Sequence, residues 1–251
     1  MWRSIGAKAT GAAHATDGVP CQDAFAHAAL AADLVAIAVA DGAGSAPFAK
    51  SGADIAVDRA VQYLHNVSEF LTSDASTWVP AVRGAFDAAR GSIIDFGRAQ
   101  GIDARQFATT LQVALLGQTA YCYGRIGDGG GVGRFDGALI PLAPAPANGF
   151  VNETTFLTSG GSAPDVVFRA DHLSECAIFT DGLQHLAMQL SEWKPHDPFF
   201  SPLFQFVRTT PDVGVAQESL GAYLRTDKVD KRTHDDRTLV VSVWTGERRV
   251  A

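Results

Sequence analysis

Residues 35–42 read V-A-I-A-V-A-D-G, a short apolar run that ends at an Asp-Gly pair. An apolar run of this length, bounded by turn residues, is typical of a buried β-strand. The pattern therefore predicts a strand over residues 34–40 that delivers the carboxylate of Asp41 at its end.

Two further apolar segments end at Asp-Gly in the same way. Residues 122–129 read C-Y-G-R-I-G-D-G and end with Asp128, and residues 176–182 read C-A-I-F-T-D-G and end with Asp181. A single Asp-Gly pair is weak evidence because it is a common turn dipeptide. Three strands that place carboxylates together at one edge of a sheet would create repulsion unless a cation lay among them. Oxygen ligands favour Mg²⁺ or Mn²⁺ over zinc.

The order of the other segments indicates the fold class. Apolar residues at helical spacing predict a helix over residues 51–67, with Ser51 as its N-cap, and a second over residues 78–96. Strands follow in the second half of the chain, with a hairpin that turns at residues 136–137. We expect these later strands at 107–116, 119–126, 131–142, 176–180 and 238–244, and helical stretches at 183–190 and within 199–224. Strands, then helices, then more strands indicate an α+β fold rather than alternating β-α-β units.

The composition limits the possible functions. The 251 residues are 47% hydrophobic and 19% charged, which excludes a disordered chain, and the length suits one large domain or two small ones. Twenty Lys and Arg against 27 Asp and Glu give a net charge of −7, so nucleic acid and anionic membranes are poor candidates as partners. The acidity has two interpretations, a solvated acidic surface or carboxylates gathered around cations.

The cysteines and the N-terminus concern the compartment. Cys21, Cys122 and Cys176 are far apart and form no C-x-x-C pair, which argues against a disulfide scaffold and against a thiolate zinc site. Residues 1–11 have no apolar core of a signal peptide, and no apolar run is long enough to span a bilayer. We therefore expect a soluble, cytoplasmic protein.

Six short motifs, in this order, resemble the PPM (PP2C-type) metal-dependent Ser/Thr protein phosphatases, particularly the bacterial branch. They are P-C-Q-D-A-F (20–25), V-A-D-G-A-G-S-A (39–46), F-A-T-T-L (107–111), I-G-D-G-G (126–130), F-T-D-G-L (179–183) and D-D-R-T-L-V-V (235–241). The resemblance implies a single PP2C-like domain over residues 1–251, a sandwich of two antiparallel β-sheets flanked by helices on both sides.

The resemblance also implies roles for the acidic residues. Asp41 would bridge two ions, Mn²⁺ or Mg²⁺, with the carbonyl of Gly42 as a further ligand. Asp181 and Asp235 would bind one of the two ions, so that Asp41, Asp181 and Asp235 form the catalytic set. Asp23 would hold metal-bound waters, and Asp128 would serve a third, weaker metal site.

Three neighbouring residues receive supporting roles from the same resemblance. Thr109 and Thr110 match a buried threonine pair that packs beneath the site. Asp236 stands where the family often has Asn and would support the ligands without binding metal.

The implied reaction needs no nucleophilic side chain. A hydroxide bridging the two ions would attack the phosphorus of phosphoserine or phosphothreonine directly. The substrate would be a phosphorylated protein, and the enzyme would oppose a Ser/Thr kinase. The alternative is a catalytically weak or inactive regulatory module that keeps the fold and binds phosphoproteins. Retention of three clustered carboxylates favours the enzyme, because a binding module has no physical need for them.

The chain departs from the family pattern at three positions. Gln22 replaces a charged residue beside Asp23, Gly18 falls where eukaryotic members have a phosphate-binding Arg, and Ala43 falls where they have a His proposed as general acid. The leaving group would then need another proton donor. His14, His185 and His234 lie near the motifs in sequence, but an ordinary surface or core-edge position is the simpler interpretation. Residues 159–162 resemble the family's flap beside the site, and a plain surface turn fits them equally well.

Overall fold

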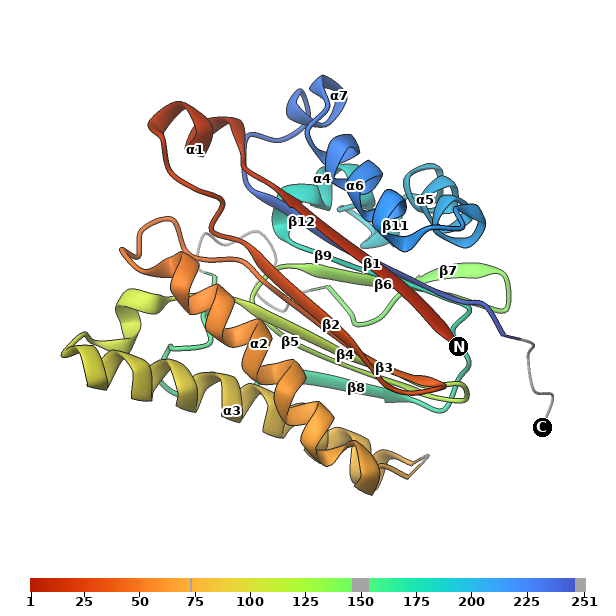
Figure 1. The fold of residues 1–251 in the computed structure, drawn as a ribbon, viewed down its shortest axis with the longest axis horizontal. Coiled ribbons are helices and arrows are strands. Elements are labelled where there is room, and N and C mark those ends of the chain that lie inside the picture. The colour runs from red at the N-terminus through yellow and green to blue at the C-terminus, as the bar shows by residue number, and fades with distance from the viewer. Residues whose placement is uncertain (73, 146–153, 247–251) are drawn as a thin grey trace.

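Two five-stranded antiparallel sheets stack face to face in the computed structural model, and helices cover both outer faces (Figure 1). The structure describes residues 1–72, 74–145 and 154–246. This arrangement confirms the expected α+β sandwich.

The first sheet has the strand order β1-β12-β9-β6-β7 and the second has the order β2-β3-β4-β5-β8. The first sheet consists of β1 (Trp2–Ala9), β12 (Arg237–Trp244), β9 (Glu175–Phe179), β6 (Gly130–Phe135) and β7 (Ala138–Pro141). The second consists of β2 (Ala24–Ala31), β3 (Leu34–Ala40), β4 (Leu111–Leu116), β5 (Tyr121–Ile126) and β8 (Asp165–Arg169). The two ends of the chain therefore pair in one sheet, with Ile5 opposite Val241.

Helices α2 (Ala49–Val67) and α3 (Ala75–Gln100) cover the second sheet, and α5 (Asp197–Thr209) and α6 (Val213–Leu224) cover the first (Figure 1). The shorter helices are α1 (Ala12–Asp17), α4 (Gln184–Ala187), α7 (Asp227–Asp230) and the 3₁₀ turns η1 (Ser68–Phe70), η2 (Ala104–Phe107) and η3 (Asp181–Leu183). A two-stranded ribbon joins β10 (Met188–Gln189) and β11 (Lys194–Pro195).

Three layers of apolar side chains hold the sandwich together. One layer, around Phe86 and Leu111, lies between the second sheet and its helices. A second layer, around Phe200 and Leu239, lies between the first sheet and its helices. The third, around Ile37 and Ile178, lies between the two sheets. Burial on both faces explains why β3 and β9 are continuous apolar runs rather than alternating ones.

Several predicted elements are confirmed, and several boundaries are wrong. The helix expected over residues 78–96 runs from Ala75 to Gln100. Ser51 is not an N-cap, because α2 begins two residues earlier, at Ala49. The N-cap position is Phe48, whose ring stacks on that of Phe107 with centroids 5.2 Å apart. The strand expected from residue 107 begins only at Leu111. The helical stretch expected over 183–190 ends at Ala187, because Met188 and Gln189 pair with β11.

Strands β1, β2 and β8 were not predicted. The sequence of β2 is A-F-A-H-A-A-L-A, and alanine has a low preference for strands. Pairing with β3 in register, with Ala24 opposite Ala40, makes this segment a strand. Tertiary contacts therefore override the local preference here.

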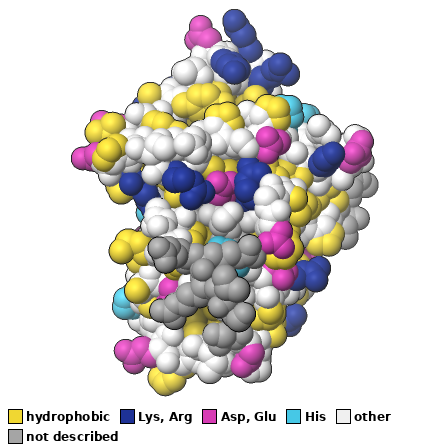
Figure 2. Space-filling model, turned by 90° about the vertical axis from the view of Figure 1, so that its right-hand side faces the viewer, with side chains coloured by type: hydrophobic (Ala, Val, Ile, Leu, Met, Phe, Trp, Pro, Cys, Tyr) yellow, Lys and Arg dark blue, Asp and Glu magenta, His cyan; other side chains and the backbone are white. Residues whose placement is uncertain are grey.

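The cysteines, the helix lengths and the surface charges bear on the other sequence-based expectations. Cys122 and Cys176 are buried and Cys21 is partly buried, and all three are free thiols. In the described residues, no helix combines the length and the apolar character needed to cross a membrane. On the face shown in Figure 2, Lys and Arg side chains lie among Asp and Glu side chains rather than forming a continuous basic surface.

Candidate metal centre

Three carboxylates meet where strands of both sheets end. Asp41 follows β3, Asp128 follows β5 and Asp181 follows β9, and one oxygen from each lies within 4.8 Å of the other two. The expectation that they meet is confirmed, but not at the edge of a single sheet. β3 and β5 belong to the second sheet and β9 to the first, so the cluster lies across the end of the sandwich.

Asp23 lies beneath this cluster and is fully buried. Its Oδ2 accepts a hydrogen bond of 2.8 Å from the hydroxyl of Thr180, the residue before Asp181. The charges of Asp23 and Asp181 both raise the pKa of Asp41. The opening motif therefore lies next to the clustered carboxylates.

Asp235 and Asp236 behave differently although they are adjacent. Asp235 is exposed and lies outside the group of three, yet its charge raises the pKa values of Asp41 and Asp181. Asp236 is buried and is not one of the three clustered carboxylates. Its carboxylate accepts hydrogen bonds from the backbone N–H groups of Gly11 at 2.7 Å and Gln22 at 2.6 Å.

The buried threonine pair fixes the backbone of Asp41. The Asp41 N–H donates to Thr110 Oγ1 at 2.9 Å, and the hydroxyl of Thr109 donates to the Asp41 carbonyl, also at 2.9 Å. The Thr110 N–H donates to that same carbonyl at 2.8 Å. Thr109 also forms an isolated antiparallel bridge with Gly42, just before β4 begins. The pair therefore positions the ligand directly, which is more than packing beneath it.

Two glycines allow backbones to approach closely at the site. A Cβ on Gly42 would lie 2.8 Å from the carbonyl oxygen of Gln22 and 2.9 Å from that of Ala49. A Cβ on Gly182 would overlap the carbonyl oxygen of Asp236. In this tight packing, a side chain on either residue would displace the neighbouring aspartate.

Burial and mutual repulsion raise the pKa values of Asp41 and Asp181. Burial is the larger cause for both, and neighbouring carboxylates add to it. The pKa of Asp181 rises to about 7, and that of Asp41 rises well above its ordinary value. The pKa of Asp23 rises to about 7, mainly through burial. Raised pKa values mean that the ionised form of these carboxyls is unfavourable in the folded protein. A cation among them would relieve the repulsion.

The donor atoms of the site fit a hard divalent cation. Within the described residues, Asp23 Oδ1, Asp128 Oδ1 and Gln22 Oε1 are buried without a hydrogen-bond partner. Buried acceptors of this kind require a hydrogen-bond donor or a cation. Because all are oxygens, the set matches Mg²⁺ or Mn²⁺ and their bound waters.

Asp128 connects the cluster to the segment that follows β7. Its Oδ2 accepts a hydrogen bond of 2.8 Å from the hydroxyl of Thr154, and its backbone carbonyl accepts one from the side chain of Gln184. Neither contact was predicted, because Thr154 and Gln184 lie outside the recognisable motifs.

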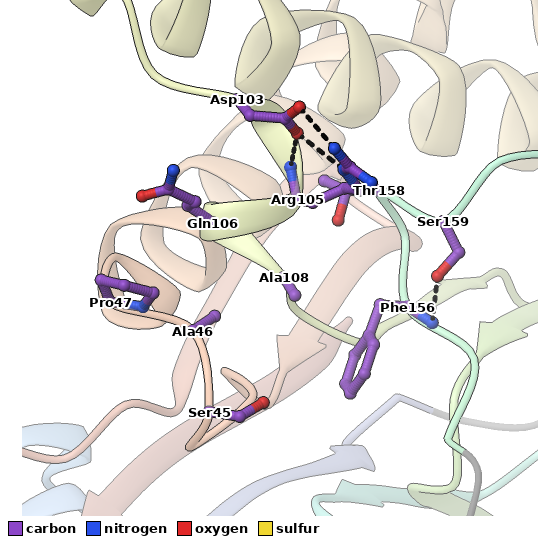
Figure 3. Close-up of a pocket in the computed structure, with 10 residues that line it drawn as sticks. All are labelled: Ser45, Ala46, Pro47, Asp103, Arg105, Gln106, Ala108, Phe156, Thr158 and Ser159. Atoms are coloured by element: carbon purple, nitrogen blue, oxygen red, sulfur yellow. Dashed lines mark hydrogen bonds and ion pairs between the residues drawn. The ribbon is translucent and has the colours of Figure 1, made fainter.

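A cavity of about 520 Å³ lies beside the loop that follows Asp41 (Figure 3). Its walls come from residues 45–47, from residues 103–108 around η2, and from residues 156–159. Arg105 and Asp103 form an ion pair of 2.9 Å on one wall. None of the three clustered carboxylates lines it. Ser159, the first residue of the 159–162 segment, does line it, so this segment lies next to the loop of Asp41.

The comparisons with known proteins agree with this geometry. Residues 10–225 match the sequence model of the family described as "Protein phosphatase 2C". The chain belongs to the protein phosphatase 2C family. It is 31% identical over 261 residues to serine/threonine-protein phosphatase 3 of Escherichia coli (strain K12), covering 97% of this chain and 98% of the relative.

Solved structures of the phosphatase 2C family show the same fold. The catalytic domain of the phosphatase PstP, solved in complex with two manganese ions, has a TM-score of 0.63 at 17% identity and covers 96% of this chain and 97% of its own. A bacterial serine phosphatase has a TM-score of 0.67 at 12% identity and covers 98% of this chain and 99% of its own.

Sequence reasoning missed Thr180 and the contact between His14 and Asp236. Thr180 stands inside the F-T-D-G-L motif, and its position before Asp181 could have identified it. The nitrogen Nδ1 of His14 lies 3.0 Å from Asp236 Oδ2. That contact spans 222 positions along the chain, so no local signal could have found it.

Proposed function

We propose that this protein is a Mn²⁺- or Mg²⁺-dependent protein Ser/Thr phosphatase. The observation that carries the proposal is the convergence of Asp41, Asp128 and Asp181 within 4.8 Å in a member of the phosphatase 2C family. The relative from Escherichia coli, whose printed name is serine/threonine-protein phosphatase 3, supports the same reaction class.

Residues of this chain would hold two ions, and a third more weakly. Asp41 and the Gly42 carbonyl would bind at the centre, with Asp181 and Asp235 on one side, Asp23 through waters and Asp128 at the weaker position. When bound, the ions would supply a hydroxide near neutral pH by lowering the pKa of a coordinated water, for direct attack on phosphorus, and would offset the charge of the phosphoryl group. The threonine pair keeps Asp41 in place, and Thr180 orients Asp23.

The substrate would be a protein phosphorylated on Ser or Thr, and the enzyme would oppose a Ser/Thr kinase in the cytoplasm. The deciding experiment compares the wild type with Asp181→Asn on a phosphothreonine peptide, with added Mn²⁺ and then with EDTA. We expect turnover that requires Mn²⁺, is abolished by EDTA and falls at least about 100-fold in the variant.

The matched control is Asp33→Asn. Asp33 is exposed in the turn between β2 and β3, at the opposite end of β3 from Asp41. This variant should retain full activity. Wild-type protein with no Mn²⁺-dependent turnover above Asp181→Asn would overturn the proposed enzyme and leave the regulatory module as the better interpretation.

A further inference from the structure

His14 is held at one ring nitrogen and open at the other. Its Nδ1 lies 3.0 Å from Asp236 Oδ2, and the side chain of Asp236 is only 2% exposed. Two backbone N–H groups also bind the Asp236 carboxylate and fix its orientation. A carboxylate only accepts hydrogen bonds, so Nδ1 carries the hydrogen and the ring is oriented by Asp236.

The other nitrogen, Nε2, faces the loop that follows Asp41. A Cβ built on Gly44 would meet a single atom within 4 Å, and that atom is His14 Nε2 at 4.0 Å. Gly44 is exposed, and the His14 side chain keeps 23% of its surface open. Among the described residues, Nε2 has no hydrogen-bond partner. A group of a bound substrate could therefore reach Nε2 from the open space beside Gly44.

The reaction requires a proton donor for the leaving oxygen. Cleavage of the bond between phosphorus and a seryl or threonyl oxygen leaves a strongly basic alkoxide, which a positioned acid can protonate. Ala43, on the same loop, has no proton to donate. His185 and His234 are exposed, and in the described part of the chain neither is paired with a carboxylate.

We propose that His14 is the general acid of this phosphatase, which rests on the proposed function. As water oxygen bonds to phosphorus, the P–O bond to the side chain breaks and its electron pair goes to the departing oxygen. The Nε2–H of the protonated ring gives its proton to that oxygen. The proton released by the attacking water restores His14 through solvent, and the products are the free alcohol and inorganic phosphate.

The test compares substrates whose leaving groups differ in basicity. Asn at position 14 keeps an amide nitrogen near the place of Nδ1, able to donate to Asp236, and lacks Nε2. On a phosphothreonine peptide, kcat of His14→Asn should fall about 100-fold. On p-nitrophenyl phosphate, whose phenolate leaves without a proton, it should fall less than about 3-fold. Across a series of aryl phosphates, the loss should grow as the leaving group becomes more basic.

Two measurements and a control variant separate this role from a structural one. The melting temperature and the Mn²⁺ affinity by calorimetry should match the wild type, and the control His65→Asn, on the exposed end of α2, should show no change in any assay. Equal losses on both substrates, or no loss on either, would overturn the assignment.

A second variant covers the case in which His14→Asn does not fold. His14→Gln places a nitrogen near Nε2 that has no transferable proton, so the same substrate-dependent loss is expected, and its absence would overturn the assignment. Failure of the proposed function is distinct, because the wild type would then show no Mn²⁺-dependent turnover on either substrate.

Discussion

The hydroxyl of Thr180 donates a hydrogen bond of 2.8 Å to Asp23, a contact that joins the two sheets at the metal centre. Thr180 follows β9 of the first sheet, and Asp23 precedes β2 of the second. The Thr180 hydroxyl oxygen also accepts a hydrogen bond of 2.9 Å from the N–H of Thr238 in β12. One side chain thus links the opening motif to two strands that arrive much later in the chain.

Replacement of Thr180 by Val should therefore destabilise the protein. Val has the same shape but leaves the Thr238 N–H and Asp23 without their partner. A buried polar group without a partner costs about 1–3 kcal/mol, so we expect a loss of about 2–4 kcal/mol in the free energy of unfolding, measured with urea. Thr209→Val is the control, because Thr209 is exposed and bonds only to the carbonyl of Gln205 within α5. Equal stability of the two variants would contradict the role of Thr180.

The metal-free protein should lose stability as the pH rises towards 7. The pKa values of Asp23 and Asp181 rise to about 7 in the folded protein, from an ordinary value of 3.8. A raised pKa means that the proton stabilises the fold. This contribution is complete below the ordinary value and is lost as the pH passes the folded value, with about 1.4 kcal/mol per pH unit for each proton.

The measurement is urea unfolding in EDTA at several pH values between 4 and 8, for the wild type and Asp181→Asn. The variant has one titrating group fewer, so its stability should fall less steeply with pH. Parallel curves would show that Asp181 titrates in the folded protein much as it does in the unfolded chain.

Gln22→Glu should strengthen Mn²⁺ binding. Gln22 Oε1 is buried beside Asp23 with no hydrogen-bond partner in the described residues. A carboxylate there adds charge to the ligand set, and ligand charge tunes the affinity of such sites. We expect Kd for Mn²⁺ to fall about 10-fold, or about 1.4 kcal/mol, in calorimetry at pH 8.

The same substitution should destabilise the metal-free protein, because it adds a negative charge to a cluster that already repels itself. Gln100→Glu, at the exposed end of α3, makes the same chemical change away from the site and should alter neither quantity. Unchanged Mn²⁺ affinity in Gln22→Glu would place Gln22 outside the metal's surroundings.

Glu175 should matter for stability but not for catalysis. Its buried carboxylate accepts hydrogen bonds of 2.6 Å from Arg134 and from Arg208. Glu175→Gln removes the opposing charge from Arg208, whereas Arg134 keeps an ion pair with Asp197 at 3.5 Å, so we expect a loss of about 1–3 kcal/mol in the free energy of unfolding. Glu175 begins β9 and Asp181 follows its end, so about 20 Å separate the two along the strand. We expect a lower melting temperature and an unchanged kcat at temperatures where the variant stays folded. A fall in kcat of the folded variant would contradict this separation.

The sequence alone determined the fold class and predicted most of the carboxylates that we propose as metal ligands. Buried strands such as β3 are continuous apolar runs, and the Asp-Gly pair that ends each of them is visible without any structure. Of the five acidic residues proposed for the metal centre, three follow strands of this kind, whereas Asp23 and Asp235 stand before strands and came from the other family motifs. Local chemistry carries this information, because turn residues and apolar runs act within a few positions.

Only the tertiary structure decided what surrounds those ligands. Strand β2 exists because β3 pairs with it, and helix α2 begins where Phe48 meets Phe107. The contacts of Thr180 with Asp23 and of His14 with Asp236 span 157 and 222 positions, respectively. A hydrogen bond between such distant residues depends on how two sheets stack, and no pattern of neighbouring residues encodes that.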